Sequence, residues 1–145
     1  MPRHALPALL LLTPLTGCSL FGITQKVDVD RTRVTLEGGV EYEVLLPGTG
    51  AAAELGDRVL VDYDGFLSSG ASFDSSRQRG IPLEVVVGEA PLLGWNDLLL
   101  GMRVGEQRRA SLPPEQAYGP EGVEGLIPPD ETLVFELELL EILSE

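Results

Sequence analysis

The sequence contains few of the residues from which metal centres and disulfide frameworks are built. Its 145 residues include one cysteine, Cys18, and one histidine, His4. A single cysteine cannot close a disulfide within the chain, and one residue of each kind leaves no Cys/His cluster for zinc. We therefore expect no disulfide framework and no metal site.

Positive charge is also scarce. Ten Lys and Arg residues stand against 23 Asp and Glu residues, which gives a formal net charge of −13. A chain with this charge repels nucleic acid and anionic lipid head groups, so we expect no nucleic-acid partner. Hydrophobic residues still make up 43% of the chain, enough for the core of one globular domain.

The amino terminus carries an apolar run that is too short to span a bilayer of about 30 Å. Residues 1–17 contain Arg3 and no acidic residue, and the apolar stretch that follows Arg3 is interrupted by Pro7 and Pro14. This order of charge and apolar residues is typical of a secretory signal peptide. We expect residues 1–17 to be absent from the mature protein.

The end of this segment, Leu15-Thr16-Gly17-Cys18, resembles the bacterial lipobox. The resemblance implies lipidation at Cys18, and because each buried methylene contributes about 0.8 kcal/mol, acyl chains would hold even an acidic protein on a membrane. The alternative is a plain secretory signal with an incidental cysteine. Ser19 stands directly after the cysteine, where it resembles the residue found in enterobacterial lipoproteins of the outer membrane. The expected location is therefore the bacterial cell envelope, on the outer membrane facing the periplasm.

Residues 18–36 have mixed polarity and no helical periodicity, which predicts a lipidated tether, and residues 37–145 are predicted to form the domain. A helix is expected over 91–100, where Leu92, Trp95 and Leu99 recur at spacings of three and four between Pro91 and Gly101. Five segments have the alternating or β-branched pattern of strands: 40–44, 58–64, 83–87, 106–112 and 133–139.

These elements predict an α+β domain in which four or five antiparallel strands bury their apolar face against one short helix. Gly65, directly after the second strand pattern, is expected to mark the end of that strand or a bulge. The chain shows no internal repeat.

Three stretches of the domain resemble the FKBP family of peptidyl-prolyl cis-trans isomerases: VDYDG at 61–65, FDSSR at 73–77, and a block from AYG at 117–119 to LIPPDETLVF at 126–135. The resemblance extends over roughly residues 39–143 in order and with nearly constant spacing. It implies the family's fold, a twisted antiparallel β-sheet wrapped around one short α-helix. It also implies rotamase activity.

The resemblance implies a site of two sets of residues. The set expected to act in catalysis is Tyr63, Asp74, Trp95, Tyr118 and Phe135. The set expected to bind substrate is Phe73, Leu83, Val85, Leu92, Val123, Leu126 and Ile127.

The roles that the resemblance implies are specific. Trp95 would form the floor under the proline ring, and Asp74 would orient the amide at the edge of the pocket. The hydroxyl of Tyr118 and the backbone N–H of Ile127 would donate hydrogen bonds to ligand carbonyls.

This sequence departs from the commonest family pattern at three positions. Leu83 and Val85 stand where aromatic residues are frequent, and Val123 replaces a frequent histidine.

Such a site needs neither a nucleophile nor a cofactor. Rotation about an X-Pro bond is opposed by a barrier of about 18–20 kcal/mol because amide resonance must be broken, and an apolar pocket favours the less polar twisted form. The prediction is an isomerase that accelerates proline-limited folding of envelope proteins. The alternative is a non-catalytic module that binds proline peptides, or acts as a chaperone, through the same pocket.

The expected partners are unfolded polypeptides that contain proline, with macrolides such as tacrolimus as candidate ligands. The membrane would be contacted only through the lipid on Cys18, and a monomer is expected. Considered singly, Trp95 is ordinary core packing, and Asp74 with the two serines after it is a turn or helix cap. Only the joint occurrence of these residues indicates a pocket.

Overall fold

The computed structural model describes residues 33–143, so the predicted signal peptide, Cys18 and most of the predicted tether lie outside the described residues. Strand β1 (Val34–Thr35) pairs with β2 (Glu41–Leu46) through Val34↔Tyr42 and Thr35↔Glu41. The sheet therefore begins a few residues before the predicted domain boundary at residue 37. No helix between residues 33 and 143 is long and apolar enough to cross a bilayer.

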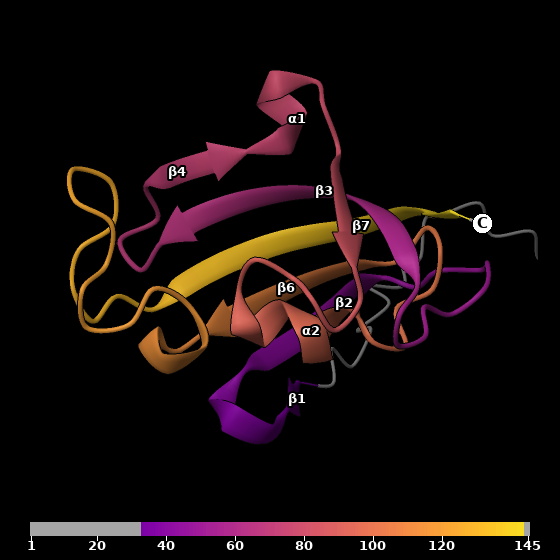
Figure 1. Ribbon diagram of the computed structural model, residues 1–145, viewed down its shortest axis with the longest axis horizontal. Coiled ribbons are helices and arrows are strands. Elements are labelled where there is room, and N and C mark those ends of the chain that lie inside the picture. The colour runs from indigo at the N-terminus through magenta and orange to yellow at the C-terminus, as the bar shows by residue number, and fades with distance from the viewer. Residues whose placement is uncertain (1–32, 144–145) are drawn as a thin grey trace, which may run out of the picture.

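One antiparallel sheet dominates the fold (Figure 1). Its longest pairing joins β3 (Arg58–Leu67) and β7 (Leu133–Leu143), which run side by side from Arg58↔Leu143 to Leu67↔Leu133. Its spatial order is β1, β2, β6 (Gln107–Leu112), β7 (Leu133–Leu143), β3 (Arg58–Leu67) and β4 (Ser72–Ser75), with β5 (Leu83–Val86) paired to the other half of β3.

Helix α2 (Leu93–Leu99) lies across one face of this sheet, as Figure 1 shows. A single helical turn, α1 (Ser76–Arg79), follows β4, and two short 3₁₀ turns, η1 (Glu37–Gly39) and η2 (Pro114–Gln116), occupy loops. The predicted α+β fold, a twisted antiparallel sheet wrapped around one short helix, is thus confirmed. The structure adds β1, β4 and α1, which are too short to give a periodic sequence signal.

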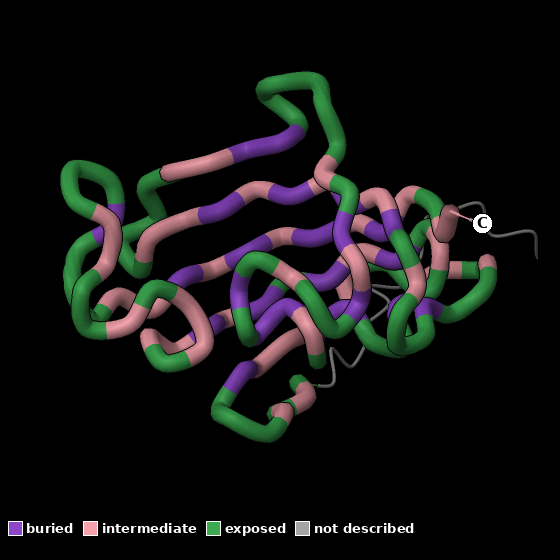
Figure 2. Tube along the Cα trace, viewed as in Figure 1, coloured by how far each residue is buried: buried purple, intermediate pink, exposed green. Residues whose placement is uncertain are grey.

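The core lies between the sheet and α2. Buried and half-buried residues alternate from Val59 to Phe66 in β3 and from Leu133 to Leu140 in β7, a pattern that Figure 2 shows along both strands. Val59 and Val61 therefore belong to the same core as Leu137 and Leu139. Each fully buried residue of this kind stabilises the fold by about 1.5–3 kcal/mol. The alternation predicted for 58–64 and 133–139 is confirmed, and β7 continues four residues beyond the predicted end.

Gly65 marks a bulge, as predicted, but it does not end its strand. The pairing of β3 with β4 shifts register between Gly65 and Phe66, while β3 continues to Leu67. A Cβ atom on Gly65 would lie 2.7 Å from the ring of Phe73 and 3.0 Å from that of Phe135. The missing side chain therefore lets two aromatic rings come together over the sheet.

The boundaries of α2 differ partly from the prediction. The helix begins at Leu93 with Leu92 as its N-cap, so Pro91 precedes the helix and is not in its first turn. Gly101 follows the helix with a left-handed φ of 80°, a conformation that glycine adopts readily at a helix end. A Cβ atom on Gly94 would lie 2.9 Å from the side chain of Leu112, so this glycine allows α2 to approach β6 closely.

Candidate functional site

Aromatic residues from separate elements meet in one hollow over α2. It measures ≈ 280 Å³ when the space open to solvent is included. All five residues predicted to act in catalysis line it, together with three of those predicted to bind substrate, and Pro91 was not predicted. The lining consists of Tyr63, Phe73, Asp74, Leu83, Pro91, Leu92, Trp95, Tyr118 and Phe135.

Trp95 lies at the centre of an aromatic cluster and is only 2% exposed. Its ring centroid is 5.1 Å from that of Tyr63 and 5.2 Å from that of Phe135, with interplanar angles of 74° and 90°. Phe73 extends the cluster, because its ring lies 5.7 Å from that of Phe135 at 82°. These edge-to-face contacts fix the rings in place and exclude water from the space between them.

The indole nitrogen of Trp95 is buried and has no hydrogen-bond partner among the described residues. An unpaired buried donor costs about 1–3 kcal/mol.

One edge of the hollow is polar and tightly connected. The hydroxyl of Tyr63 donates to Oδ2 of Asp74 at 2.5 Å and accepts from Nη2 of Arg79 at 3.0 Å. Arg79 also pairs with Oδ1 of Asp74, which in addition accepts from the backbone N–H of Ser75 at 2.8 Å. Asp74 therefore holds the Tyr63 ring against the indole.

This arrangement shifts the acidity of both groups. Burial by itself would raise the pKa of Asp74, but the hydrogen bonds from Tyr63 and Arg79 and the positive charge of Arg79 outweigh it, and the pKa is lowered. Burial raises the pKa of Tyr63, as does its hydrogen bond to Asp74, while Arg79 opposes the rise. At neutral pH the pair consists of a carboxylate and a neutral phenol.

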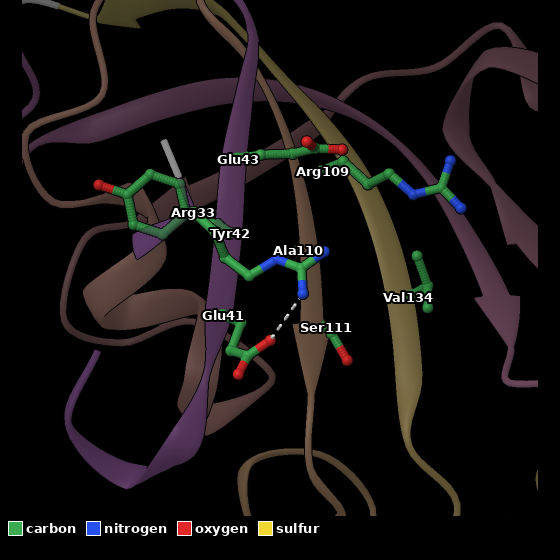
Figure 3. A pocket seen from close by; sticks show the side chains of 8 residues that line it. All are labelled: Arg33, Glu41, Tyr42, Glu43, Arg109, Ala110, Ser111 and Val134. Carbon is green, nitrogen blue, oxygen red and sulfur yellow. Dashed lines mark ion pairs between the residues drawn. The ribbon is translucent and has the colours of Figure 1, made fainter. Parts of the chain in front are cut away.

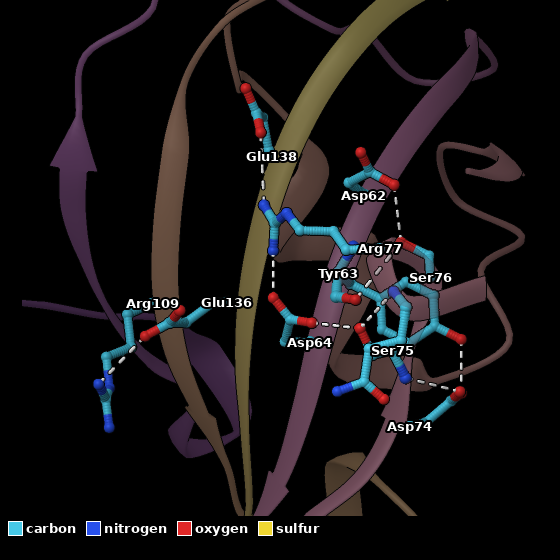
Figure 4. A network of polar contacts seen from close by, with 11 residues as sticks. Asp62, Tyr63, Asp64, Asp74, Ser75, Ser76, Arg77, Arg109, Glu136 and Glu138 are labelled. Atoms are coloured by element: carbon cyan, nitrogen blue, oxygen red, sulfur yellow. Dashed lines mark hydrogen bonds and ion pairs between the residues drawn. The ribbon is translucent and has the colours of Figure 1, made fainter. Parts of the chain in front are cut away.

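The FDSSR segment is fixed by a second network (Figure 4). The hydroxyl of Ser76 donates to Asp62 at 2.8 Å and accepts from the backbone N–H of Tyr63 at 2.8 Å. Ser75 caps α1, since its hydroxyl accepts from the N–H of Gln78 at 3.1 Å. Asp74 therefore lines the hollow, while the next residue, Ser75, caps α1. The network holds β4 beside β3.

Further ion pairs extend this network over the solvent face of the sheet. Arg77 pairs with Asp64 and, at 3.3 Å, with Glu138 (Figure 4). Arg109 pairs with Glu136 at 3.2 Å.

Tyr118 stands at the rim of the hollow and is 40% exposed. Its hydroxyl makes no hydrogen bond to another described residue, so it is available to a ligand. Burial, and secondarily the charge of Asp74, raises the pKa of Tyr118, which keeps the hydroxyl protonated as a donor.

The expectation for Ile127 needs correction. Its N–H donates to the carbonyl of Val123 at 2.8 Å and is used inside the loop. In contrast, the N–H of Leu92 makes no hydrogen bond to any other residue within 33–143, and Leu92 lines the hollow. The sequence did not predict this donor. The one signal for it is the position of Leu92 just before α2.

Four residues predicted to bind substrate lie outside the hollow. Val85 is 4% exposed and belongs to the core, because it points inward from β5 opposite Val59. Val123, Leu126 and Ile127 line a neighbouring groove formed by the loop between Tyr118 and β7.

A further hollow on the solvent face of β2, β6 and β7 contains none of the predicted residues (Figure 3). It is crossed by the ion pair between Arg33 and Glu41 at 3.8 Å. Among the described residues, no group of three or more His, Cys, Asp or Glu side chains is arranged to hold a metal ion.

Comparison with known proteins gives consistent matches. The family model described as "FKBP-type peptidyl-prolyl cis-trans isomerase" matches residues 50–140. FK506-binding protein 1 of Candida glabrata is 43% identical over 110 residues, covering 74% of this chain and 96% of that protein. The FK506-binding protein of Neisseria meningitidis is 41% identical over 106 residues, covering 72% and 97%.

Solved structures are similar as well. The peptidyl-prolyl cis-trans isomerase of Pseudomonas syringae matches with a TM-score of 0.69 and 37% identity, over 77% of this chain and 81% of that chain. FkpA from Escherichia coli matches with a TM-score of 0.69 and 40% identity, over 76% of this chain but only 51% of that chain. The span matched by the family model includes every residue that lines the hollow over Trp95.

Proposed function

This chain belongs to the FKBP-type peptidyl-prolyl cis-trans isomerases, and on that basis we propose that it binds and twists X-Pro bonds in the hollow over Trp95 while serving protein folding in the cell envelope. The isomerase activity follows from the family. The identity of the site and the biological setting are the proposal.

The observation that carries the site is the packing of Tyr63 and Phe135 against the buried indole, at centroid distances of 5.1 and 5.2 Å. Phe73 extends the cluster at 5.7 Å from Phe135. A planar amide has a large dipole that water solvates well, and the twisted amide has lost part of it. An apolar, water-poor hollow therefore binds the twisted form more tightly than the planar one. Each 1.4 kcal/mol of this preference accelerates isomerisation about tenfold.

Two donors would orient the substrate. Tyr118 and Leu92 both line the hollow, and neither the hydroxyl of Tyr118 nor the N–H of Leu92 has a partner among the described residues. Carbonyls that flank the proline would accept from them. Asp74 would act at the edge, where it fixes Tyr63 and orients the twisting amide.

The same hollow suits macrolide ligands of the FK506 type, in keeping with the names of the relatives in Candida glabrata and Neisseria meningitidis. The envelope setting is supported by the signal-like segment 1–17 and the lipobox-like motif ending in Cys18. We propose a lipid-anchored monomer on the outer membrane.

The catalytic proposal is tested with the full chain in a proline-limited refolding assay. The slow phase should accelerate in proportion to enzyme concentration. Binding of a proline peptide without acceleration would instead indicate a non-catalytic module. Incorporation of labelled palmitate into the wild type, but not into Cys18→Ala, tests the anchor, and equal labelling of both would refute it.

A further inference from the structure

The loop between Tyr118 and β7 forms a groove that is lined by apolar residues and by two carboxylates. It measures ≈ 790 Å³ when open space is included, nearly three times the hollow over Trp95 at ≈ 280 Å³. Two carboxylates, those of Glu121 and Glu124, stand among its apolar residues. The apolar part of the lining is Leu67, Val123, Leu126, Ile127, Pro128 and Pro129.

The groove has a fixed shape. Val123 and Ile127 exchange backbone hydrogen bonds of 2.9 and 2.8 Å, and the N–H of Asp130 donates to the carbonyl of Gly119 at 3.1 Å. Gly122 has a φ of 60°, and a Cβ atom there would lie 2.7 Å from the carbonyl carbon of Pro128. The loop is therefore tightly closed at Gly122, and binding of a ligand would lose little conformational entropy of the loop.

The charge of this loop has one sign. Residues 113–133 contain no Lys or Arg, and their acids are Glu115, Glu121, Glu124, Asp130 and Glu131.

No described arginine pairs with Glu121 or Glu124. The arginines of α1 and β6 are engaged elsewhere. Arg77 pairs with Asp64 and Arg79 with Asp74, while Arg108 pairs with Glu106 and Arg109 with Glu136. The carboxylates of Glu121 and Glu124 are therefore not neutralised by a described arginine and can accept a cation from outside.

We infer that this groove binds a lysine or arginine side chain of the client polypeptide, near the proline held over Trp95. Such side chains combine an apolar stem with a charged head. The stem would lie along Leu126 and Pro128, with the head at Glu121 and Glu124. A calcium ion would need six to eight oxygen ligands, more than two carboxylates on apolar walls provide.

The groove and the proline hollow share one loop, since Tyr118 lines the hollow and residues 121–129 line the groove. A chain bound in the hollow can thus reach the groove within a few residues. The inference rests on the proposed function and deepens it, because it assigns the enzyme a preference for X-Pro bonds with a basic residue nearby.

The test uses the full chain and peptides with one Ala-Pro bond, in which a single lysine is moved from one to five positions from the proline on either side. At the best position, kcat/KM should exceed that of the matching norleucine peptide about fivefold, as two partly exposed ion pairs allow. The excess should shrink in 1 M salt, where charges are screened over about 3 Å. Diaminopropionate, which keeps the charge but loses the stem, should recover little of the excess.

The variant pair Glu121→Gln/Glu124→Gln should bring the lysine-to-norleucine ratio close to one. The control Glu37→Gln/Glu141→Gln removes the same two charges at exposed positions away from the groove and should keep the ratio. Equal ratios in both variants, or an equal preference for diaminopropionate, would mean general charge attraction and would overturn the inference. Turnover of the norleucine peptide without any lysine preference would reject the groove alone, whereas no turnover of any peptide would reject the proposed function.

Discussion

Replacement of Phe135 by leucine tests whether the aromatic enclosure is what accelerates rotation. Phe135 is 2% exposed and contacts Tyr63, Phe73 and Trp95 edge to face. Leucine keeps the position apolar but removes the ring. Complete truncation to alanine would cost about 3–5 kcal/mol and endanger the fold, so leucine is the better probe.

The expected magnitude follows from these contacts. The two shorter ring pairs, with Trp95 at 5.2 Å and Phe73 at 5.7 Å, each contribute about 1 kcal/mol beyond burial, and the longer pair with Tyr63 at 6.3 Å adds little. Phe135→Leu should therefore lower the free energy of unfolding by about 2 kcal/mol. If some 1.4 kcal/mol of that loss also weakens binding of the twisted amide, kcat/KM falls about tenfold. The fall should appear in kcat, because the planar substrate depends less on the enclosure.

The assay pairs catalysis with stability. Peptide isomerisation gives kcat and KM, and urea unfolding followed by the fluorescence of the single tryptophan gives the free energy of unfolding. Leu139→Val is the matched control, since Leu139 is fully buried on the same face of β7, roughly 13 Å further along the strand. It should lose about 1 kcal/mol of stability with unchanged kcat/KM. Unchanged turnover in Phe135→Leu, or an equal fall of kcat/KM in Leu139→Val, would refute the reasoning.

Three more predictions concern the polar edge and the donors. Tyr118→Phe should leave the free energy of unfolding within about 0.5 kcal/mol, because its hydroxyl has no partner among the described residues, but should lower kcat/KM about fivefold; unchanged kinetics would remove Tyr118 from the site. Because the folded-state pKa of Asp74 is lowered, its contribution to stability is present above about pH 4 and is lost as the pH falls through the folded value, so urea titrations of Asp74→Asn should show a shallower acid limb than wild type. A parallel limb would contradict the lowered pKa. Since the pKa of Asp74 is lowered and those of Tyr63 and Tyr118 are raised, kcat/KM should be nearly constant from about pH 5 to about pH 9, and a bell-shaped profile would indicate a titrating group that this site lacks.

Sequence patterns predicted the central elements because those elements are long enough to repeat a signal. The alternation in β3 and β7, the bulge at Gly65 and the position of α2 all follow from burial on one face or from a missing side chain. Strand β4, with the sequence SFDS, and the two-residue β1 have no such repeat. Their pairing depends on tertiary contacts that no local pattern records.

The site was predictable in part. The resemblance identified the residues that meet over Trp95, since aromatic and acidic positions in the motifs lie on elements that converge. It did not distinguish backbone donors: the N–H of Ile127 is used by Val123, and Leu92 has the free one. Whether a main-chain N–H group is free depends on how its loop closes, and the local sequence does not predict that.

The position of Val85 shows a related limit. A β-branched residue in a strand pattern can face a pocket or the core, and a register change of one residue exchanges the two. Here the pairing of β5 with β3 directs Val85 inward.

The most direct measurement is exchange spectroscopy by NMR on a proline peptide with catalytic amounts of the full chain. The account predicts faster interconversion of the cis and trans peptide at an unchanged equilibrium ratio, together with a change in Trp95 fluorescence as the peptide binds. Binding reported by Trp95 with no change in the interconversion rate would contradict it.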